Sequence, residues 1–324
     1  MDDSHVTAGS PGSGPRRGGT GDAGPRPRSA AERASLIRLR RRRAGALAGV
    51  AAAALTGGLA VGAVARSSER HGTPASVRAP KALLHALPVR HTSLATQEAQ
   101  ALQRIRLKVP IVRTAGAEHR QIALTFDDGP GPFTPAVLRV LNRTHTPATF
   151  FEVGEELRYF GATTARIVRL GDPIGDHTWS HPDMAALSRR RQRMQIFRQA
   201  AAVGDEGAPF PQMYRPPYGR WNATTLDLLA QSHMLMVLWS VDTDDWERPG
   251  ARRIVHNALA GAKPGAIILM HDAGGDRSET VRALPVIIRE LRRRGYRLVT
   301  VPRLLLDNPP PRRQDIASVK GQGG

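Results

Sequence analysis

The chain has 324 residues, of which 40% are hydrophobic, and this composition excludes a wholly disordered or fibrous protein. It contains no cysteine, which excludes disulfides, thiolate metal sites, iron–sulfur clusters and cysteine nucleophiles. The net charge of +19 raises nucleic acid as a partner, but residues 118–306 carry 25 basic and 20 acidic side chains, so most of the excess lies elsewhere in the chain.

The chain begins with a polar stretch that is followed by an apolar one. Residues 1–30 are dominated by Gly, Pro, Ser and Arg and have too little apolar surface to offset chain entropy, so we expect residues 1–43 to form a disordered basic cytoplasmic tail. Arginines cluster at residues 38–43, and residues 44–65 contain no charged side chain. Twenty-two helical residues span roughly 33 Å, about the thickness of a bilayer core.

The apolar segment predicts export of the rest of the chain in either of two ways. As a transmembrane anchor it would be N-inside, because the arginines precede it, and the remainder would be extracytoplasmic on the cell membrane. As a signal sequence it would be cleaved after Ala65, at the small-x-small sequence Ala63-Val64-Ala65, and the protein would be secreted. A buried helix rich in Ala and Gly is the third alternative, but the arginine cluster and the unbroken charge-free stretch argue against it.

Two further segments lack the pattern of a folded domain. Residues 66–117 mix Pro, Ala and Arg around one short helix expected near residues 96–107, and we interpret them as a linker. Residues 307–324 are expected to form a second disordered tail. The folded domain is therefore predicted to span residues 118–306.

From residue 121 onward, short apolar runs alternate with amphipathic stretches. Strands are expected at residues 122–126, 148–153, 212–215, 234–240, 266–270 and 297–301. Helices are expected at residues 135–142, 155–170, 188–203, 223–232, 251–260 and 280–294. This alternation predicts an α/β fold, either a parallel barrel or a doubly wound sheet. In both architectures, functional side chains collect just beyond the carboxyl ends of the strands.

Acids, a base and aromatic side chains follow four of these predicted strands. They are Asp127 and Asp128 after the first strand, Arg215 and Tyr218 after the third, Asp242, Asp245 and Trp246 after the fourth, and His271 after the fifth. The Asp-Asp-Gly-Pro sequence is by itself an ordinary turn signal. Four such groups at strand ends are improbable as turns alone, so they predict one functional site.

The sequence His177-Thr-Trp-Ser-His181 indicates a metal site. Two histidines at positions i and i+4 can lie on one face of a helical turn, where both imidazoles reach one cation. A carboxylate from Asp127 or Asp128 would complete the ligand set, which suits a hydrolytic ion such as Zn²⁺ or the Fe(II) of non-haem oxygenases. The hydrolytic interpretation is favoured, because a spare acid and a facing histidine supply the general base and general acid that hydrolysis needs.

Five motifs, in chain order, carry a resemblance to a known family. They are Thr125-Phe-Asp-Asp-Gly-Pro130, His177-Thr-Trp-Ser-His181, Arg215-Pro-Pro-Tyr218, Asp242-Thr-Asp-Asp-Trp246 and Leu269-Met-His-Asp272. Together they resemble the polysaccharide deacetylase family (NodB homology domain, carbohydrate esterase family four) over residues 118–306. The resemblance implies a deformed (β/α) barrel of about six to seven parallel strands. It also implies one divalent metal ion in the barrel mouth, Zn²⁺ first, with Co²⁺, Ni²⁺ or Mn²⁺ as alternatives.

The resemblance assigns the first three motifs to the metal and the general base. Asp128, His177 and His181 would hold the ion, which would polarise the acetyl carbonyl and lower the pKa of bound water. Asp127 would take the proton of that water, and Arg215 would orient it.

The other implied roles concern the leaving group and the substrate. His271 would be the general acid that protonates the leaving amine, with its tautomer set by Asp245 or by Asp242, and the sequence leaves that choice open. The backbone N–H of Tyr218 and the metal would stabilise the oxyanion.

Substrate contacts and one departure from the family pattern complete the site. Leu269 and Trp246 would line the pocket for the acetyl methyl group. Asp176 precedes the first histidine where the family pattern more often has Asn, and the added negative charge could alter the metal preference.

These observations predict a metal-dependent hydrolase that removes acetyl groups from N-acetylated amino sugars of a polysaccharide, either peptidoglycan or chitin-like oligomers. Two alternatives stay open: an O-acetyl esterase acting on xylan with the same active centre, and an inactive protein that binds envelope polysaccharide. An exported, tethered enzyme suits a substrate that cannot diffuse to it, which favours peptidoglycan. Arginine clusters at 189–193 and 292–294 lie on predicted helices and are expected to be solvated, so no nucleic-acid partner is expected, and a monomer is favoured.

Overall fold

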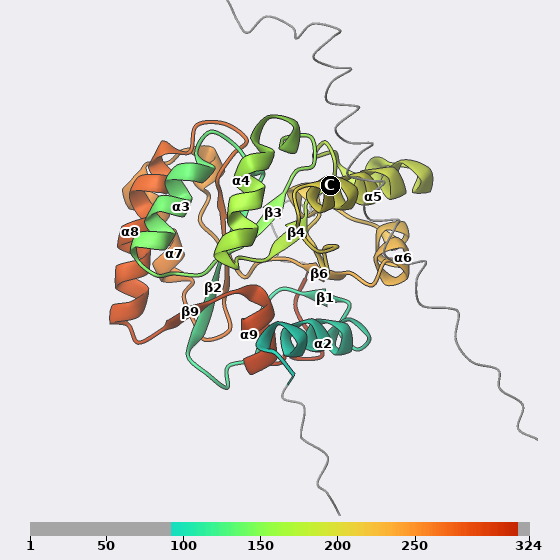
Figure 1. Ribbon diagram of the computed structural model, residues 1–324. Coiled ribbons are helices and arrows are strands. Elements are labelled where there is room, and N and C mark those ends of the chain that lie inside the picture. The colour runs from blue at the N-terminus through green and yellow to red at the C-terminus, as the bar shows by residue number, and fades with distance from the viewer. Residues whose placement is uncertain (1–91, 317–324) are drawn as a thin grey trace, which may run out of the picture. The chain divides into compact units, whose positions relative to one another are not determined.

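The computed structural model describes residues 92–316, in which strands and helices alternate around one parallel sheet (Figure 1). The strands are β1 (Ile111–Val112), β2 (Gln121–Asp127), β3 (Thr149–Glu152), β4 (Ile174–Asp176), β5 (Met213–Tyr214), β6 (Leu235–Val237), β7 (Val241–Asp242), β8 (Ile267–His271) and β9 (Arg297–Val299). The α-helices are α2 (Leu94–Arg106), α3 (Thr134–Arg143), α4 (Leu157–Leu170), α5 (Arg189–Asp205), α6 (Ala223–Gln231), α7 (Ala251–Ala260), α8 (Ser278–Arg293) and α9 (Val301–Asp307). Three short 3-10 helices are η1 (Met184–Ala186), η2 (Pro217–Gly219) and η3 (Asp245–Glu247).

The strands form an open, deformed barrel, as the sequence predicts. Their order is β1-β6-β5-β4-β3-β2-β8-β7, with β9 paired to β2, and every strand pair among the described residues is parallel. The described part of the chain has nine strands rather than the six or seven expected. The three that were not expected, β1, β4 and β7, contain only two or three residues each, which is too short to show an alternating pattern.

Successive side chains of the central strand β2 point alternately to the helix-covered face of the sheet and to the barrel interior. In β2, Ile122, Leu124 and Phe126 pack in one apolar cluster with side chains of α3 and α8, which lie together on one side of the sheet (Figure 1). The intervening residue Ala123 belongs to the interior cluster, so Asp127, two pleats further on, also points inward. Asp127 and His271 are register partners on neighbouring strands, and the pleat therefore places both at the same level of the barrel mouth.

The predicted helices from residue 135 onward agree with the observed ones to within two residues at each end. The strand expected at 297–301 ends earlier, because Thr300 caps α9 by accepting a hydrogen bond from the backbone N–H of Arg303, and Pro302 occupies the first turn. This short helix was not predicted.

Residues assigned to the linker and to the carboxyl-terminal tail form part of the packed structure, so the predicted limits of 118 and 306 are too narrow. Leu102 of α2 and both residues of β1 lie in the interior apolar cluster, and β1 pairs with β6. Asn308 is buried, and its side chain accepts a hydrogen bond from the backbone N–H of His119 at 2.6 Å. These contacts were not predicted because β1 has only two residues and lies in a segment whose Pro, Ala and Arg content is typical of a linker.

A fragment limited to residues 118–306 is expected to be much less stable than one spanning 92–316. Removing α2 and β1 exposes side chains that pack on Leu102, Ile111 and Val112, and each buried aliphatic side chain contributes about 1.5–3 kcal/mol. The loss is comparable to the whole stability of a typical domain. Thermal unfolding of both fragments, followed by circular dichroism, tests this; equal midpoints would show that the added segments are dispensable.

The tail predicted at 1–43 and the anchor or signal predicted at 44–65 lie outside the described residues. Among residues 92–316, every helix is too short or too polar to cross a bilayer.

Candidate active site

The predicted functional side chains lie at the carboxyl ends of the parallel strands. Asp127, Asp242 and His271 end β2, β7 and β8, while His177 and Arg215 directly follow β4 and β5. Because these strand ends share one edge of the sheet, the side chains converge around a pocket of about 670 Å³. Its lining residues are Asp127, Asp128, His177, His181, Pro216, Tyr218, Trp239, Asp242, Trp246, Glu247, Leu269, His271, Gly274 and Arg277. Of the predicted residues, Arg215 and Asp245 lie behind this lining, where both are buried.

Asp128, His177 and His181 face one another across a gap that suits a metal ion. Asp128 Oδ1 lies 3.5 Å from His177 Nε2 and 3.2 Å from His181 Nε2. His177 Nδ1 donates a hydrogen bond to the backbone carbonyl of Arg215 at 2.7 Å, so the lone pair of Nε2 points into the gap. Asp128 Oδ1 is buried and accepts no hydrogen bond from the described residues. A cation would satisfy all three groups at once.

The ionisation of Asp128 and its close surroundings fit the same interpretation. Burial opposes the charge of this carboxylate, but the neighbouring imidazoles of His177 and His181 and the positive charge of His271 hold its pKa well below the usual value. Gly274 has φ +70°, and a Cβ at this position would collide with Asp128 Oδ2. Two histidines and one carboxylate leave coordination positions open for water and substrate, as in catalytic zinc sites.

The two histidines lie in a loop, so the expected helical turn is wrong. Thr178 and His181 have φ of 70° and 55°, a left-handed conformation that is strained for these residues and is concentrated at functional sites. Asp176 Oδ1 accepts a hydrogen bond from the backbone N–H of Thr178 at 2.7 Å. Trp179 lies between the two histidines in sequence, and the Arg198 guanidinium lies 3.8 Å from the centroid of its ring. These contacts therefore hold the loop of residues 177–181, which we call the ligand loop, without a helix.

Replacing His181 by Ala is expected to weaken Zn²⁺ binding by at least about 100-fold, because loss of a direct ligand should exceed the 10–100-fold typical of an outer partner. His145→Ala is the matched control and should bind Zn²⁺ like the unaltered protein, since His145 lies in the loop before β3 and is not among the three ligands. Calorimetric titration with Zn²⁺ and with Co²⁺ measures both affinities. Unchanged binding by His181→Ala would remove this residue from the ligand set.

A buried arginine fixes Asp127. Arg215 Nη1 donates hydrogen bonds to Asp127 Oδ1 at 2.7 Å and to Thr125 Oγ1 at 2.8 Å, and its guanidinium lies 4.0 Å from the ring centroid of Phe151. Burial lowers the pKa of Arg215, and the negative charge of Asp127 offsets part of that effect. Arginine nevertheless stays protonated in proteins. Asp127 Oδ2 lies 3.8 Å from His177 Nε2, so this second oxygen faces the metal gap.

His271 is paired with Asp245, which resolves the choice that the sequence leaves open. Asp245 Oδ1 lies 2.7 Å from His271 Nδ1, and Asp245 Oδ2 accepts hydrogen bonds from the backbone N–H of His271 at 2.8 Å and from Thr280 Oγ1 at 2.7 Å. Burial lowers the pKa of His271, but the charge and hydrogen bond of Asp245, with the charges of Asp128 and Asp127, raise it to about 9. The imidazole is therefore protonated at neutral pH.

Asp242 lines the pocket, where it accepts hydrogen bonds from Trp239 and Asp244, whereas Asp245 is paired with His271. Its Oδ2 accepts a hydrogen bond from Trp239 Nε1 at 3.2 Å, and its Oδ1 accepts one from the backbone N–H of Asp244 at 2.9 Å. Its negative charge offsets part of the lowering of the Arg215 pKa that burial causes. Asp242 therefore adds negative charge to the pocket wall and shapes the turn that leads to η3.

Two exposed aromatic side chains flank the pocket, and an aliphatic one lies deeper. Tyr218 and Trp246 are 55% and 48% exposed, whereas Leu269 is only 3% exposed. Tyr218 has φ 59°, and its ring meets that of His181 edge-on with centroids 4.6 Å apart. A mouth flanked by aromatic rings and an apolar interior suits a sugar that carries a small methyl group.

The loop after β8 contributes residues that were not predicted from the sequence. Arg277 is buried, and it donates from Nε to the carbonyl of Ala273 at 2.7 Å and from Nη2 to the carbonyl of Gly274 at 2.8 Å. These bonds hold the loop that brings Gly274 against Asp128. Asp127 was identified because it lies at the end of a strand. The same criterion points to this loop, which follows β8. Glu247 and Trp239, which line the pocket, were missed as well.

Similarity to known proteins covers the described region. The family model for polysaccharide deacetylase matches residues 115–237. A chitooligosaccharide deacetylase from Bradyrhizobium sp. is 38% identical over 198 residues, which cover 57% of this chain and 90% of that protein. A peptidoglycan-N-acetylglucosamine deacetylase from Bacillus cereus is 39% identical over 184 residues, covering 56% of this chain and 67% of that protein. The crystal structure of a peptidoglycan N-acetylglucosamine deacetylase in complex with 4-naphthalen-1-yl-N-oxidanyl-benzamide matches with a TM-score of 0.60 at 34% identity, over 64% of this chain and 97% of that one.

Proposed function

This chain belongs to the polysaccharide deacetylase family, and we propose that it is a metal-dependent hydrolase that releases acetate from N-acetylated amino sugars of peptidoglycan. One observation carries the proposal: the Asp128, His177 and His181 ligand set, the Asp127–Arg215 pair and the His271–Asp245 pair meet around one pocket. A ligand set, a fixed carboxylate and a protonated histidine are the groups that amide hydrolysis needs. The relatives named above act on chitooligosaccharide and on peptidoglycan.

The divalent ion would be held by Asp128, His177 and His181. Zn²⁺ is the ion that we expect. Bound there, the ion would polarise the acetyl carbonyl and lower the pKa of a water molecule. The three residues fit this role because their lone pairs face one gap and the carboxylate is ionised.

Asp127 would act as the general base. Its Oδ1 is committed to Arg215, and its Oδ2 faces the gap where a water molecule would be bound, so Oδ2 would take the proton as the water oxygen attacks the acetyl carbon. The buried guanidinium fixes the orientation of the carboxylate before substrate arrives. The backbone N–H of Tyr218, at the left-handed turn of η2, would donate to the oxyanion.

His271 would act as the general acid. Its Nδ1 faces Asp245, so its Nε2 is the atom that can donate a proton to the amide nitrogen as the carbon–nitrogen bond breaks. The products are acetate and the free amine of the sugar. Register pairing places Asp127 and His271 side by side on adjacent strands, so one bound acetamido group can reach both.

Leu269 and Trp246 would enclose the acetyl methyl group, with the sugar ring beside the exposed faces of Tyr218 and Trp246. We propose that residues 44–65 export the domain, as an anchor or as a signal cleaved after Ala65, so that it meets a polymer that cannot diffuse. Export and an insoluble polymer together favour peptidoglycan over soluble chitin oligomers.

Acetate release from peptidoglycan, chitin oligomers and acetylated xylan, measured after loading with Zn²⁺, tests the proposal. We expect release from peptidoglycan with the highest kcat/KM, weaker release from chitin oligomers, and little from xylan, because His271 is arranged to protonate a leaving amine. Activity on xylan alone would identify an O-acetyl esterase. Binding without any acetate release would identify an inactive polysaccharide-binding protein.

A further inference from the structure

The end of the barrel opposite the active site carries a surface of apolar and basic side chains, which we call the basal surface. It is centred on the groove-lining side chains Arg104, Lys108 and Arg312, and the exposed Leu107 directly precedes Lys108 just after α2 ends. Lys108 lies just before β1, and the chain just before Arg312 contacts the segment that leads into β2, because the backbone N–H of Gly116 donates to the carbonyl of Asn308 at 3.1 Å. Both places are amino ends of strands, whereas the catalytic side chains follow carboxyl ends.

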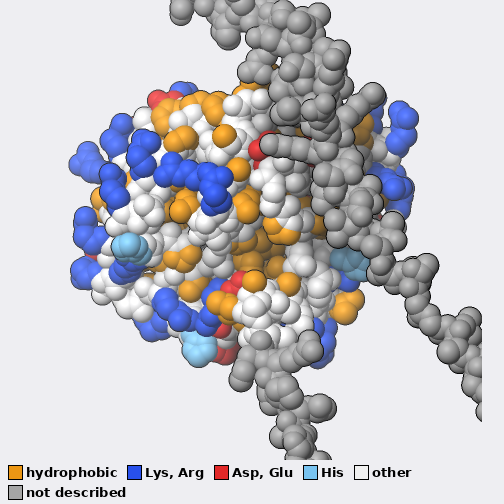
Figure 2. Space-filling model, in the orientation of Figure 1, with side chains coloured by type: hydrophobic (Ala, Val, Ile, Leu, Met, Phe, Trp, Pro, Cys, Tyr) orange, Lys and Arg blue, Asp and Glu red, His pale blue; other side chains and the backbone are white. Residues whose placement is uncertain are grey.

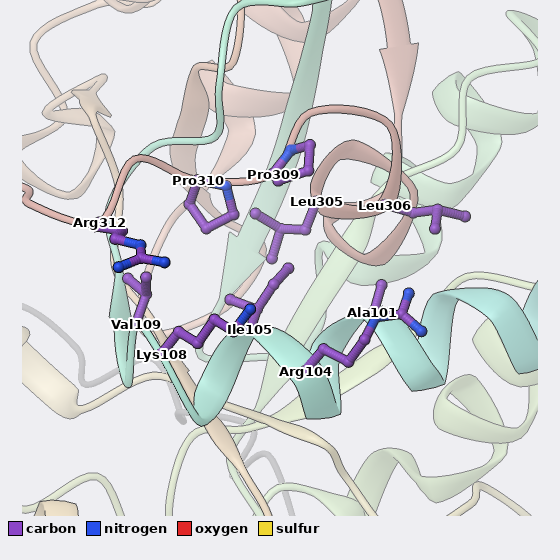
Figure 3. Close-up of a pocket in the computed structure, with 10 residues that line it drawn as sticks. All are labelled: Ala101, Arg104, Ile105, Lys108, Val109, Leu305, Leu306, Pro309, Pro310 and Arg312. Atoms are coloured by element: carbon purple, nitrogen blue, oxygen red, sulfur yellow. The ribbon is translucent and has the colours of Figure 1, made fainter.

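A groove of about 280 Å³ opens on the basal surface between α2 and the segment after α9 (Figure 3). Its walls are apolar, formed chiefly by Ile105 and Val109 on one side and Leu305 and Pro309 on the other, as the close-up shows. The charged side chains that line it are all basic: Arg104, Lys108 and Arg312. The groove therefore combines an apolar interior with a positive rim.

The basic side chains of the basal surface lie outside the ion pairs found in the described part of the chain. None of the ion pairs within residues 92–316 involves Arg104, Lys108 or Arg312. Leu107 is 73% exposed, directly before Lys108 in sequence. Figure 2 shows that Lys and Arg side chains outnumber acidic ones on the visible face of the molecule. The basal surface differs from a merely basic surface because its cations line an apolar groove.

This combination fits an anionic lipid surface better than a soluble anion. A soluble polyanion needs cations but gains nothing from an exposed leucine or an apolar groove. At the surface of a bilayer, basic side chains are attracted to anionic headgroups while neighbouring apolar side chains enter the boundary between headgroups and acyl chains. Long basic side chains also extend their charge to the headgroups while their methylene groups stay near apolar surface.

The place where the chain enters the domain supports this partner. The described part begins at residue 92, and α2, the helix that carries the basal surface, starts at Leu94. The apolar segment 44–65 precedes it by fewer than 30 residues. If residues 44–65 form an anchor, it joins the domain at α2, the helix beside the basal surface.

We propose that the basal surface seats the domain on the anionic phospholipids of a membrane, with Leu107 inserted and with Arg104, Lys108 and Arg312 on the headgroups. The active-site pocket, at the other end of the barrel, then faces away from the bilayer and toward polymer that lies beyond it. This inference does not depend on the reaction, because none of its residues lines the catalytic pocket.

A single label at position 107 tests the contact in the full chain. The protein has no cysteine, so Leu107→Cys accepts a polarity-sensitive fluorophore without background labelling. The matched control is Tyr159→Cys, because Tyr159 is 76% exposed and lies on α4, outside the basal surface. Each labelled chain is mixed with vesicles of phosphatidylcholine containing 30% phosphatidylglycerol, and with vesicles of phosphatidylcholine alone.

We expect a blue shift of emission, and quenching by spin-labelled lipid, for the label at 107 with the anionic vesicles only, and neither for the label at 159. Each basic side chain near an anionic surface strengthens association about fivefold, so Arg104→Gln, Lys108→Gln and Arg312→Gln together should weaken the contact on the order of 100-fold and abolish the shift. Arg190→Gln, Arg191→Gln and Arg193→Gln make the same change in charge on exposed positions of α5 and should leave it intact.

Three outcomes would overturn the proposal. A label at 107 that stays in water with anionic vesicles rules out lipid contact at this surface. Equal loss in the two triple variants would show attraction to net charge without a defined face. A label already shielded in solution without vesicles would show that another segment of this chain, or a second copy, covers the groove. Acetate release from a soluble oligomer, measured in parallel, is expected to stay unchanged in the basal triple variant, which confirms that it is folded.

Discussion

Replacing Asp127 by Asn is expected to lower kcat/KM for acetate release by about 100-fold or more while the amount of bound metal stays unchanged. A positioned proton-transfer group contributes typically 10²–10⁴-fold. Asn keeps the size of the side chain, and its amide oxygen can still accept the 2.7 Å hydrogen bond from Arg215, so the loss is specific to the ability to take a proton. Steady-state kinetics on an N-acetylglucosamine oligomer and metal analysis of the same preparation measure the two quantities.

Asp172→Asn is the matched control for this substitution. Asp172 is also buried, and its Oδ1 accepts a hydrogen bond from the backbone N–H of Ala148 at 2.9 Å, but it lies just before β4, at the amino end of the sheet. Its replacement should leave kcat/KM unchanged. Near-normal turnover by Asp127→Asn would show that another group takes the proton, and loss of metal in this variant would show that Asp127 supports the ligand set instead.

The sequence predicted the barrel and the convergence of its side chains because both depend on local patterns. Short apolar runs mark β2 and β8, and a period near 3.6 marks helices such as α8, whose buried residues lie on one face. Once the strands are parallel, their carboxyl ends share one edge, so Asp127 and His271 had to meet. No knowledge of the distances was needed for that inference.

The features that the sequence did not predict depend on contacts between distant segments. The strand β4, Ile174–Asp176, has one buried glycine between its ends and no periodic pattern, and it is extended only because β3 and β5 pair with it. The His177–His181 segment has the spacing of a helical turn, but left-handed backbone at Thr178 and His181 and hydrogen bonds from neighbouring segments hold it as a loop. Spacing alone does not reveal such tertiary contacts.

The sequence left the choice between Asp242 and Asp245 as the partner of His271 open for a related reason. The two residues lie three positions apart, and either could face β8. Left-handed backbone at Asp244, with φ 55°, turns the chain into η3 and carries Asp245 to the side of His271. Thr280 of α8 then fixes its second oxygen. Contacts among η3, β8 and α8 therefore settle the pairing.

Replacing His271 by Ala is expected to lower kcat/KM by 10²–10⁴-fold for an N-acetylglucosamine oligomer, but far less for an aryl acetate. An amine leaves poorly unless it is protonated, whereas a phenolate with electron-withdrawing groups leaves without a proton. Comparing chitin oligomers with 4-nitrophenyl acetate on the same Zn²⁺-loaded preparation separates the two cases. Equal impairment of both substrates would assign His271 to positioning or to the ligand loop, and would remove it as the acid.

The pH dependence of the same pair follows from the charge of Asp245. The acid must be protonated, so activity is lost as pH rises through the pKa of His271, which is raised from 6.5 to about 9. A cation beside Asp128 offsets part of that increase, so we expect the alkaline limb of kcat/KM between these two values. Asp245→Asn removes the strongest influence that raises the pKa, so the limb should move toward lower pH, while Thr280→Val should move it much less because the carboxylate charge remains. An alkaline limb that stays in place in Asp245→Asn would show that a different group titrates there, and the assignment of His271 and Asp245 as one protonated pair would be wrong.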